Sequence, residues 1–253
     1  MGNLERGGTE MRILMMTAAI AIASLAAAQD AEAGTVLDAV KARGELICGT
    51  RGETQGFARR DDKGKFIGFD VDMCRAVAAT LFGDAGRVKY VPLAAAKRFP
   101  TLQEGAVDML ASGSTLTLTR DTTLGLDFVA VYYFDSQAFM VPRKLAKKSA
   151  RDLGGATICM QSGTTTADNV DEYFRNSGMA FKPVLVNGAE ELRAAFFAGR
   201  CDVFTADRSA VYAARAAYAS NPTDYVILPE SASREPLALI VRQGDPEFSE
   251  VVR

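Results

Sequence analysis

Residues 102–110 read LQEGAVDML, and residues 197–204 read FAGRCDVF. Each stretch has the pattern of a helix end, a glycine, two further residues, an aspartate and an apolar strand. Each is also preceded by a predicted strand and a predicted helix, so the order of elements repeats as well as the phrase. This repetition predicts two similar α/β lobes rather than one sheet. A chance match is the alternative, because a glycine that ends a helix before a strand is common.

Strands and helices alternate along both halves of the chain. In the first half we expect strands at residues 45–49, 66–69, 89–92, 107–111 and 139–141, extended chain at 128–134, and helices at 36–43, 71–82 and 98–103. In the second half we expect strands at residues 156–160, 181–186, 201–205, 225–228 and 237–241, and helices at 168–176, 189–197 and 209–218. Asp70 stands where an aspartate caps a helix, so we expect it to cap the helix at 71–82.

The first 33 residues have the three parts of a secretory signal. Arg12 follows a second methionine, Met11, and a short apolar run at residues 13–25 ends in alanine-rich cleavage sites of the A-x-A type. The run is too short to span a bilayer comfortably, and a buried N-terminal helix is the alternative. We therefore expect translation to start at Met11, removal of residues 1–33 and a periplasmic location.

The charge balance excludes several kinds of partner. The chain has 29 basic and 31 acidic residues, and without residues 1–33, which hold two arginines and four acidic residues, 27 of each remain. A neutral chain argues against nucleic acid and against an anionic membrane surface. The chain has no histidine, which removes histidine bases, triads and metal ligands. We expect no cofactor and no metal.

Four cysteines in an exported chain indicate disulfides. Three pairings are possible, and we favour Cys48 with Cys74 and Cys159 with Cys201, because each bridge then stays within one half of the chain. A zinc site made of four thiolates is the rival interpretation, and it lacks the usual C-x-x-C pair.

Two α/β lobes would place a ligand at the carboxyl ends of their strands. The segments at those ends are residues 50–57, Arg98, residues 112–115, residues 161–166 and Asp207. They are rich in hydroxyl groups, with charged residues among them and no metal-binding cluster. This composition is typical of a site for a small polar molecule.

Five segments in order resemble the polar amino-acid periplasmic binding proteins of ABC importers. The five are residues 46–49, residues 68–78, residues 117–121 together with 126–128, residues 161–166, and residues 199–203. The cysteine positions resemble the general L-amino-acid branch, and the match covers about residues 35–253. The resemblance implies an α/β, two-lobed periplasmic binding protein fold of type II. Each lobe is then a mixed sheet flanked by helices, and the ligand cleft lies between the lobes.

The resemblance also implies a site for an α-amino acid. Arg120 matches the arginine that binds the α-carboxylate through two hydrogen bonds, and Asp207 matches the aspartate that accepts from the ammonium. Thr115 and Thr165 would add backbone and hydroxyl donors, and Thr165 opens a helix. The other ligand-binding positions that it implies are Ser112, Gly113, Thr164, Arg98 and Thr54.

Several of these residues have another interpretation. Arg120 could pair with Asp121 or Asp127 on the surface, and Arg98 could be an ordinary exposed helix residue. The residues that could act as plain helix caps are Asp207 and Thr164. A carboxylate pair at Asp70 and Asp72 could suggest catalysis, but a helix cap is the favoured role.

The function expected from these residues is capture of an L-amino acid by a monomeric binding protein that serves an ABC permease in the inner membrane. Arg98 and Arg120 together favour an acidic or amide amino acid. One alternative is a dehydratase-like enzyme on the same fold, for which Glu53 is the glutamate available in the cleft segments. Another is a soluble, ligand-sensing partner of a receptor.

The resemblance divides the chain into lobe 1 at residues 35–136, lobe 2 at 137–233 and a return to lobe 1 at 234–253. Residues 112–116 read SGSTL, where the general amino-acid branch is expected to carry Arg-Asn-Thr-Thr-Trp. The family also continues with helices beyond the position of Arg253, so we expect the return segment to be incomplete.

Overall fold

The computed structural model describes residues 35–253. The predicted signal peptide, residues 1–33, lies outside the described residues. The helices are α2 (Val36–Arg43), α3 (Phe69–Phe82), α4 (Arg98–Gln103), α5 (Leu118–Thr123), α6 (Thr165–Asn176), α7 (Ala189–Phe197), α8 (Arg208–Tyr218) and α9 (Pro246–Val252), with 3-10 turns at Arg143–Leu145, Ala150–Asp152 and Pro222–Asp224. Within this described part, no helix is both long enough and apolar enough to cross a membrane.

The strands form one large mixed sheet and one small sheet. They are β1 (Leu46–Thr50), β2 (Glu53–Thr54), β3 (Ala58–Arg60), β4 (Phe66–Ile67), β5 (Val88–Pro92), β6 (Met109–Thr115), β7 (Leu126–Pro142), β8 (Thr157–Gln161), β9 (Lys182–Val186), β10 (Val203–Asp207), β11 (Tyr225–Ile227) and β12 (Arg234–Arg242). The large sheet has the order β5-β1-β6-β12-β7-β10-β8-β9 with β11 beside β7, and the small sheet has the order β2-β3-β4. The predicted α/β class is confirmed, but one sheet runs through both halves, where the repeat had predicted two lobes rather than one sheet.

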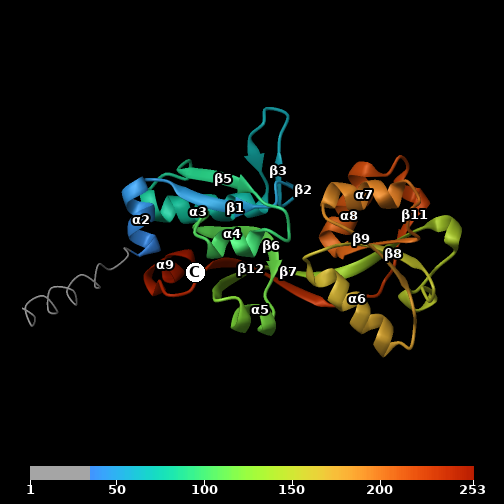
Figure 1. Ribbon diagram of the computed structural model, residues 1–253. Coiled ribbons are helices and arrows are strands. Elements are labelled where there is room, and N and C mark those ends of the chain that lie inside the picture. The colour runs from blue at the N-terminus through green and yellow to red at the C-terminus, as the bar shows by residue number, and fades with distance from the viewer. Residues whose placement is uncertain (1–34) are drawn as a thin grey trace, which may run out of the picture. The chain divides into compact units, whose positions relative to one another are not determined.

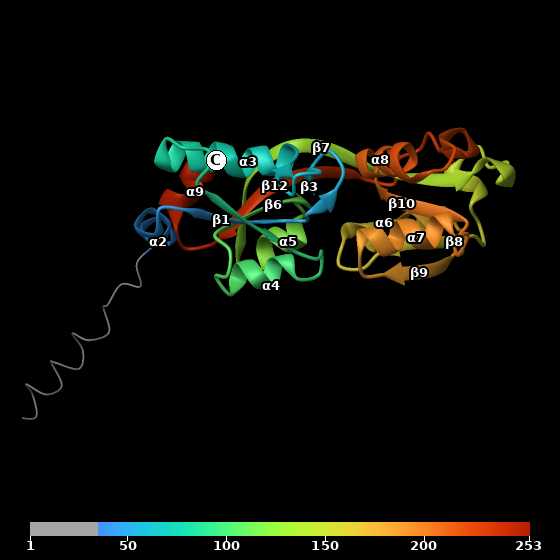
Figure 2. The same ribbon diagram turned by 90° about the horizontal axis from the view of Figure 1, so that it is seen from above.

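Strands β7 and β12 connect the two halves of the large sheet. β12 pairs antiparallel with β7 from Arg242 opposite Leu126 to Arg234 opposite Ser136. One residue further, at Gln137, β7 takes β10 as its partner, with Asp207 opposite Gln137. Figures 1 and 2 show β7 and β12 running side by side between the two groups of helices. The two predicted segments at 128–134 and 139–141 are therefore one continuous strand of 17 residues.

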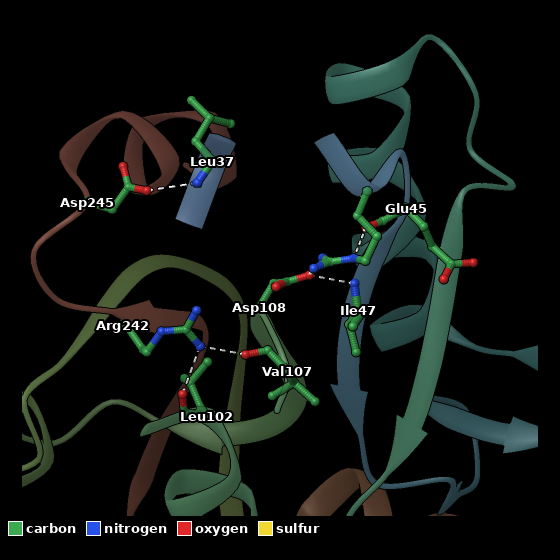
Figure 3. Close-up of polar contacts among 9 residues, drawn as sticks. Leu37, Glu45, Ile47, Leu102, Val107, Asp108, Arg242 and Asp245 are labelled. Atoms are coloured by element: carbon green, nitrogen blue, oxygen red, sulfur yellow. Dashed lines mark hydrogen bonds and ion pairs between the residues drawn. The ribbon is translucent and has the colours of Figure 1, made fainter. Parts of the chain in front are cut away.

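The repeated glycine–aspartate phrase has the same geometry in both halves. β1 lies parallel between β5 and β6, and β8 lies parallel between β9 and β10. Asp108 accepts a hydrogen bond from the backbone N–H of Ile47 at 2.7 Å (Figure 3), and Asp202 accepts one from the N–H of Thr157 at 2.8 Å. In each case an aspartate at the start of one strand holds the first residues of its parallel neighbour. The repeat read from the sequence is thus a structural repeat.

Helices cover both faces of each half. In the first half, Val77 of α3 and Phe248 of α9 pack in one core, while Leu102 of α4 belongs to another. Figure 2 shows α3 and α4 on opposite sides of β1. In the second half, Leu192 of α7 and Val211 of α8 pack on one face, and Phe174 of α6 packs on the other. Figure 1 shows α7 and α8 on one side of these strands and α6 on the other.

Two charged side chains, at the end of β12 and the start of α9, make hydrogen bonds to the first half of the chain. Arg242 donates from Nη1 to the carbonyls of Leu102 at 2.9 Å and Val107 at 2.7 Å (Figure 3). Asp245 accepts from the backbone N–H of Leu37 in α2 at 2.9 Å. These contacts attach the end of β12 and the start of α9 to the elements that begin the first half.

One local prediction is wrong, and three short elements were missed. α3 begins at Phe69 with Gly68 as its N-cap, so Asp70 lies inside the helix and does not cap it. Gly68 has a φ of +123°, and a methyl group there would stand 2.3 Å from the carbonyl oxygen of Phe57, so only glycine fits this position. A strand was predicted at residues 66–69, where β4 lies, but β2, β3 and α5 were not predicted.

The two disulfides join the favoured pairs. Cys48 pairs with Cys74 at a Cα–Cα distance of 6.2 Å, and Cys159 pairs with Cys201 at 5.7 Å. The first joins β1 to α3, and the second joins β8 to the start of the segment leading into β10. Each bridge therefore stays within one half and ties a central strand to its neighbouring element.

Removing either disulfide is expected to lower the free energy of unfolding by about 3–4 kcal/mol, since the bridges close loops of 26 and 42 residues. The variants are the double serine replacements at Cys48 and Cys74 and at Cys159 and Cys201, measured by urea denaturation. A peptide map of the unreduced protein is the control, and a bridge between Cys48 and Cys159 would contradict the pairing.

Candidate ligand-binding site

One cavity of the described region is lined by both halves of the chain. Its volume is about 920 Å³, part of it open to solvent. From the first half it receives the loop after β1, the start of α4, the end of β6 and α5. From the second half it receives the loop between β8 and α6, the end of β10, and faces of α7 and α8. The strands of both halves thus present their carboxyl ends to it, as the sequence predicted.

All but one of the predicted ligand-binding residues line this cavity. They are Thr54, Arg98, Gly113, Thr115, Arg120, Thr164, Thr165 and Asp207. The exception is Ser112, which is buried and shares a hydrogen bond of 2.9 Å with the hydroxyl of Ser114. Ser112 therefore lies behind the wall of the cavity and does not form part of its lining.

Arg98 is not an exposed helix residue, because only 2% of it is accessible to solvent. Its Nη1 donates to the carbonyls of Ala95 at 2.6 Å and Gly163 at 3.2 Å, and its Nε has no partner among the described residues. Burial lowers the pKa of Arg98 well below its usual value, and the nearby guanidinium groups of Arg51 and Arg120 lower it further. Two other cations thus lie near a buried guanidinium.

Arg120 does not form the predicted alternative pair with Asp121 or Asp127. None of the ion pairs found in residues 35–253 includes it. Its Nη1 donates to the carbonyl of Thr115 at 3.0 Å, and its guanidinium lies 5.2 Å from the ring centre of Phe99. Arg120 is therefore oriented by the end of β6 and lines the cavity without an ion pair to any carboxylate of the described residues.

Arg51 lies in the segment 50–57 that was expected at the strand ends, but it was not among the predicted ligand-binding residues. It follows β1 directly, donates from Nη2 to Oε1 of Gln161 at 2.5 Å, and so crosses from the first half to the second. Burial lowers its pKa. Its place at the carboxyl end of a central strand was a usable signal, since the same criterion selected Arg98 and Asp207.

A buried aspartate, Asp70, and a half-buried one, Asp207, lie near these arginines. Burial, together with the nearby carboxylates of Asp135 and Glu235, raises the pKa of Asp207 to about 7. Asp207 holds the N-cap position of α8, but its side chain makes no capping hydrogen bond, so the plain cap role is wrong. Burial also raises the pKa of Asp70 to about 6. Asp70 accepts from the hydroxyl of Tyr132 at 2.6 Å, and its Oδ2 has no partner among the described residues.

The side chains of the predicted threonines make hydrogen bonds within the protein. The hydroxyls of Thr115 and Thr165 both donate to Oε2 of Glu235, the latter at 3.0 Å. Thr164 caps α6 by accepting from the N–H of Thr166 at 3.3 Å, so its cap role is real, and it also lines the cavity. With their hydroxyls engaged, Thr115 and Thr165 have their backbone N–H groups to offer a ligand.

Glu53, on which the enzyme alternative depended, is exposed on β2 and is not among the cavity residues. A general acid must lie within hydrogen-bond reach of the substrate. The structure therefore does not place Glu53 for the role that this alternative requires.

The sheet, its two α/β halves and the cavity at their strand ends define a two-lobed binding protein. Residues 46–253 match the model for bacterial extracellular solute-binding proteins, family 3, and the chain belongs to this family. The family is one of binding proteins that act outside the cytoplasm.

Three similar proteins illustrate the relationship. The general L-amino acid-binding periplasmic protein AapJ of Rhizobium johnstonii is 46% identical over 242 residues, which cover 96% of this chain and 71% of AapJ. The glutamate/glutamine/aspartate/asparagine-binding protein BztA of Rhodobacter capsulatus is 47% identical over 92% of this chain and 68% of BztA. A periplasmic binding protein from Brucella ovis, solved with glutathione bound, has a TM-score of 0.83 and 49% identity over 87% of this chain and 69% of its own.

The two halves approach each other closely at Gly163. A methyl group at this position would stand 2.9 Å from the Cα of Ala96, which is backbone and has little freedom to move. Gly163 also has a φ of +72°, which favours glycine. The loop before α6 can therefore contact the loop before α4 only because position 163 carries no side chain.

Gly163→Ala is expected to weaken ligand binding, because its methyl group would hold the two halves apart. Overpacking of this kind costs about 1–3 kcal/mol, or roughly 5–150-fold in Kd. Gly178→Ala is the matched control, because its φ is +65° and a methyl group there meets no atom within 4 Å. Titration calorimetry measures the Kd of both variants. Thermal unfolding measures how much stability each variant loses because alanine is strained at a positive φ. Equal Kd values for the two variants would contradict the prediction.

Proposed function

We propose that this protein captures an L-amino acid outside the cytoplasm and delivers it to an ABC permease in the inner membrane. The observation that carries the proposal is one cavity with a guanidinium, Arg120, and a carboxylate, Asp207, contributed by different halves of the chain. An α-amino acid has the complementary pair of charges. The names of AapJ and BztA, which describe amino-acid binding, support the same function.

The roles follow from the donors available. Arg120 binds the α-carboxylate with its planar pair of N–H donors. The backbone N–H groups of Thr115 and Thr165 add to this, and Thr165 lies in the first turn of α6, where a helix favours an anion. Asp207 accepts from the ammonium. Gly113, Thr164 and Thr54 form the surrounding wall.

The ligand we favour has an acidic or amide side chain. With Arg120 and Asp207 assigned to the backbone of the amino acid, Arg51 and Arg98 face the same space with Asp70 as the remaining anion. The site then has an unbalanced positive charge in a buried environment, where a carboxylate is a strong partner. The relative BztA, named for glutamate, glutamine, aspartate and asparagine, agrees with this class.

A longer ligand with a free amino-acid end is a second candidate. The cavity extends beyond Asp207 along α8 to Tyr218, about 16 Å along a helix of this length. Its wall there is made of small side chains, including Ala210 and Ala213, with Arg193 near the end. The Brucella ovis protein was solved with glutathione, a ligand of this kind, so a short γ-glutamyl peptide belongs in the binding assays.

The lobe boundaries belong to the same proposal. We assign lobe 1 to residues 35–136, lobe 2 to 137–233 and a return segment to 234–253. The exchange of β7 partners between Ser136 and Gln137 supports this division, because a pair of strands crossing between two lobes is where a hinge can bend. We further propose that the protein acts as a monomer in the periplasm, after removal of residues 1–33, and has no catalytic role.

The test is a binding assay of the purified, oxidised protein against the standard amino acids, dicarboxylates and a γ-glutamyl peptide. A ligand that binds only the folded state raises stability by about 2.7 kcal/mol at a hundredfold excess over its Kd. We expect a thermal shift with acidic or amide amino acids. No shift with any amino acid or peptide would overturn the proposal.

Arg120→Met is expected to raise the Kd for the best ligand by at least about thirtyfold, since loss of one partner of a buried charge pair costs about 2–5 kcal/mol. Arg87→Met is the control, because Arg87 is exposed and remote from the cavity. Titration calorimetry on both variants makes the comparison. An unchanged Kd for Arg120→Met would remove Arg120 from the site.

Binding is expected to weaken as the pH falls below about 7. The pKa of Asp207 is raised to about 7, so the free protein increasingly holds a neutral carboxyl below that pH, and a neutral carboxyl attracts an ammonium poorly. Affinity should then fall by up to about tenfold per pH unit, and binding should release a proton. Calorimetry at pH 6 and 8 measures both effects. Asp207→Asn should bind weakly at both values, and a wild-type affinity that is the same at pH 6 and 8 would contradict this role.

A further inference from the structure

Glu235 is a buried carboxylate that no part of the proposed ligand site uses directly. It is 1% exposed, lies near the start of β12 and does not line the cavity. Its Oε2 accepts from the hydroxyls of Thr115 and Thr165. Its Oε1 accepts from Nδ2 of Asn169 at 2.6 Å and from the hydroxyl of Ser233. Four donors from three segments of the chain therefore converge on one side chain.

Two of these donors, Thr115 and Thr165, line the cavity from different halves of the chain. Thr115 ends β6 in the first half, and its carbonyl orients Arg120 at 3.0 Å. Thr165 and Asn169 lie one turn apart on α6 in the second half. Glu235 thus binds directly to Thr115 in the first half and to Thr165 in the second, the two threonines proposed to bind the ligand carboxylate.

The group that accepts these four hydrogen bonds is a carboxylate, and no neutral side chain of the same size could accept all of them. An ionised carboxylate only accepts hydrogen bonds, so it can satisfy all four donors at once. Hydrogen bonds to an ionised group are shorter and about twice as strong as neutral ones. An amide in its place would offer one accepting oxygen and a nitrogen that donates, so it could accept from the threonine pair or from the pair Asn169 and Ser233, but not from both.

We propose that Glu235 is a positioning residue, which fixes Thr115 and Thr165 relative to each other so that their backbone N–H groups converge on one ligand carboxylate. This proposal rests on the amino-acid-binding function proposed above. Glu235 acts only through the threonines and Asn169, so it contributes to affinity without touching the ligand.

The charge of Glu235 has a second effect on the site. Asp207 is faced by Asp135 from β7 and Glu235 from β12, which raise its pKa, and by Arg51 and Arg98 from the first half, which lower it. Removal of the negative charge at position 235 therefore lowers the pKa of Asp207. A residue that only filled space would not change this titration.

The test is Glu235→Gln, which keeps the size of the side chain and removes its charge. We expect the Kd for the best ligand of the panel to rise about tenfold or more at pH 8, as for loss of hydrogen bonds to a charged group. We also expect the pH below which binding weakens to move downward from the wild-type value of about 7. Calorimetric titrations between pH 5.5 and 8.5 give both quantities.

Glu230→Gln is the matched control. Glu230 also accepts from a serine hydroxyl, Ser149 at 2.5 Å, and from a backbone N–H, that of Ala150 at 3.0 Å, but it lies away from the cavity. The Glu230→Gln protein should bind the best ligand with the Kd and the pH dependence of the wild type. A Glu235→Gln protein with wild-type Kd and pH profile would overturn the proposal.

Thr165→Val tests the positioning role of Glu235 if the Glu235→Gln protein does not fold. This change removes one donor to Glu235 and keeps the backbone N–H of Thr165. A raised Kd supports positioning by Glu235, and a wild-type Kd overturns it. When both variants fold, their combined effect should be smaller than the sum of the separate effects, because they break the same contact. Failure of the wild-type protein to bind any ligand would instead overturn the proposed function itself.

Discussion

The antiparallel pairing of β7 with β12 is the constraint on which the rest of the structure depends. It is the connection through which the sheet of the first half continues into that of the second, and β7 exchanges β12 for β10 between Ser136 and Gln137. Because each half is otherwise complete, with its own central strands, disulfide and cores, the halves are related mainly through this crossing. The cavity walls come from both halves, so the geometry of the crossing determines how far apart the opposing ligand-binding groups lie.

Much of this fold was readable in the sequence, because its repeated unit has a strong local signature. The glycines at 105 and 199 end helices with a positive φ, and Asp108 and Asp202 then bind the backbone of the neighbouring parallel strand. The helix-ending glycines are short-range features, which a sequence pattern records well. The aspartates bond to partners 61 and 45 residues away, and only the repetition of the phrase marked them in the sequence. The single long strand β7 was predicted as separate pieces, because its exposed and buried residues follow two different sets of partners along its length. That change of environment is a property of the tertiary structure.

The candidate site was predictable to the extent that it lies at strand ends. The rule that ligands bind at the carboxyl ends of strands, joined to a family resemblance, placed Arg98, Arg120 and Asp207 around one cavity. The rule does not reach Asp70, which looked like a helix cap and instead lies buried inside α3. Nor does it reach Glu235, whose partners are 120 and 70 residues away in sequence. Long-range hydrogen bonds leave no periodic signal, so such residues are found only when the chain is folded.

The site has an electrostatic property that follows from its burial. A charged group taken out of water loses solvation, and this cost is recovered only by a well-placed opposite charge. Arg51, Arg98 and Arg120 all have lowered pKa values for this reason, while Asp207 has a raised one. The charged form of each of these groups is therefore destabilised by burial, and a ligand group of the opposite charge would stabilise it. Under the proposed function, a ligand with separate anionic and cationic ends would supply both kinds of interaction at once, so the same residues would also determine the selectivity of the site.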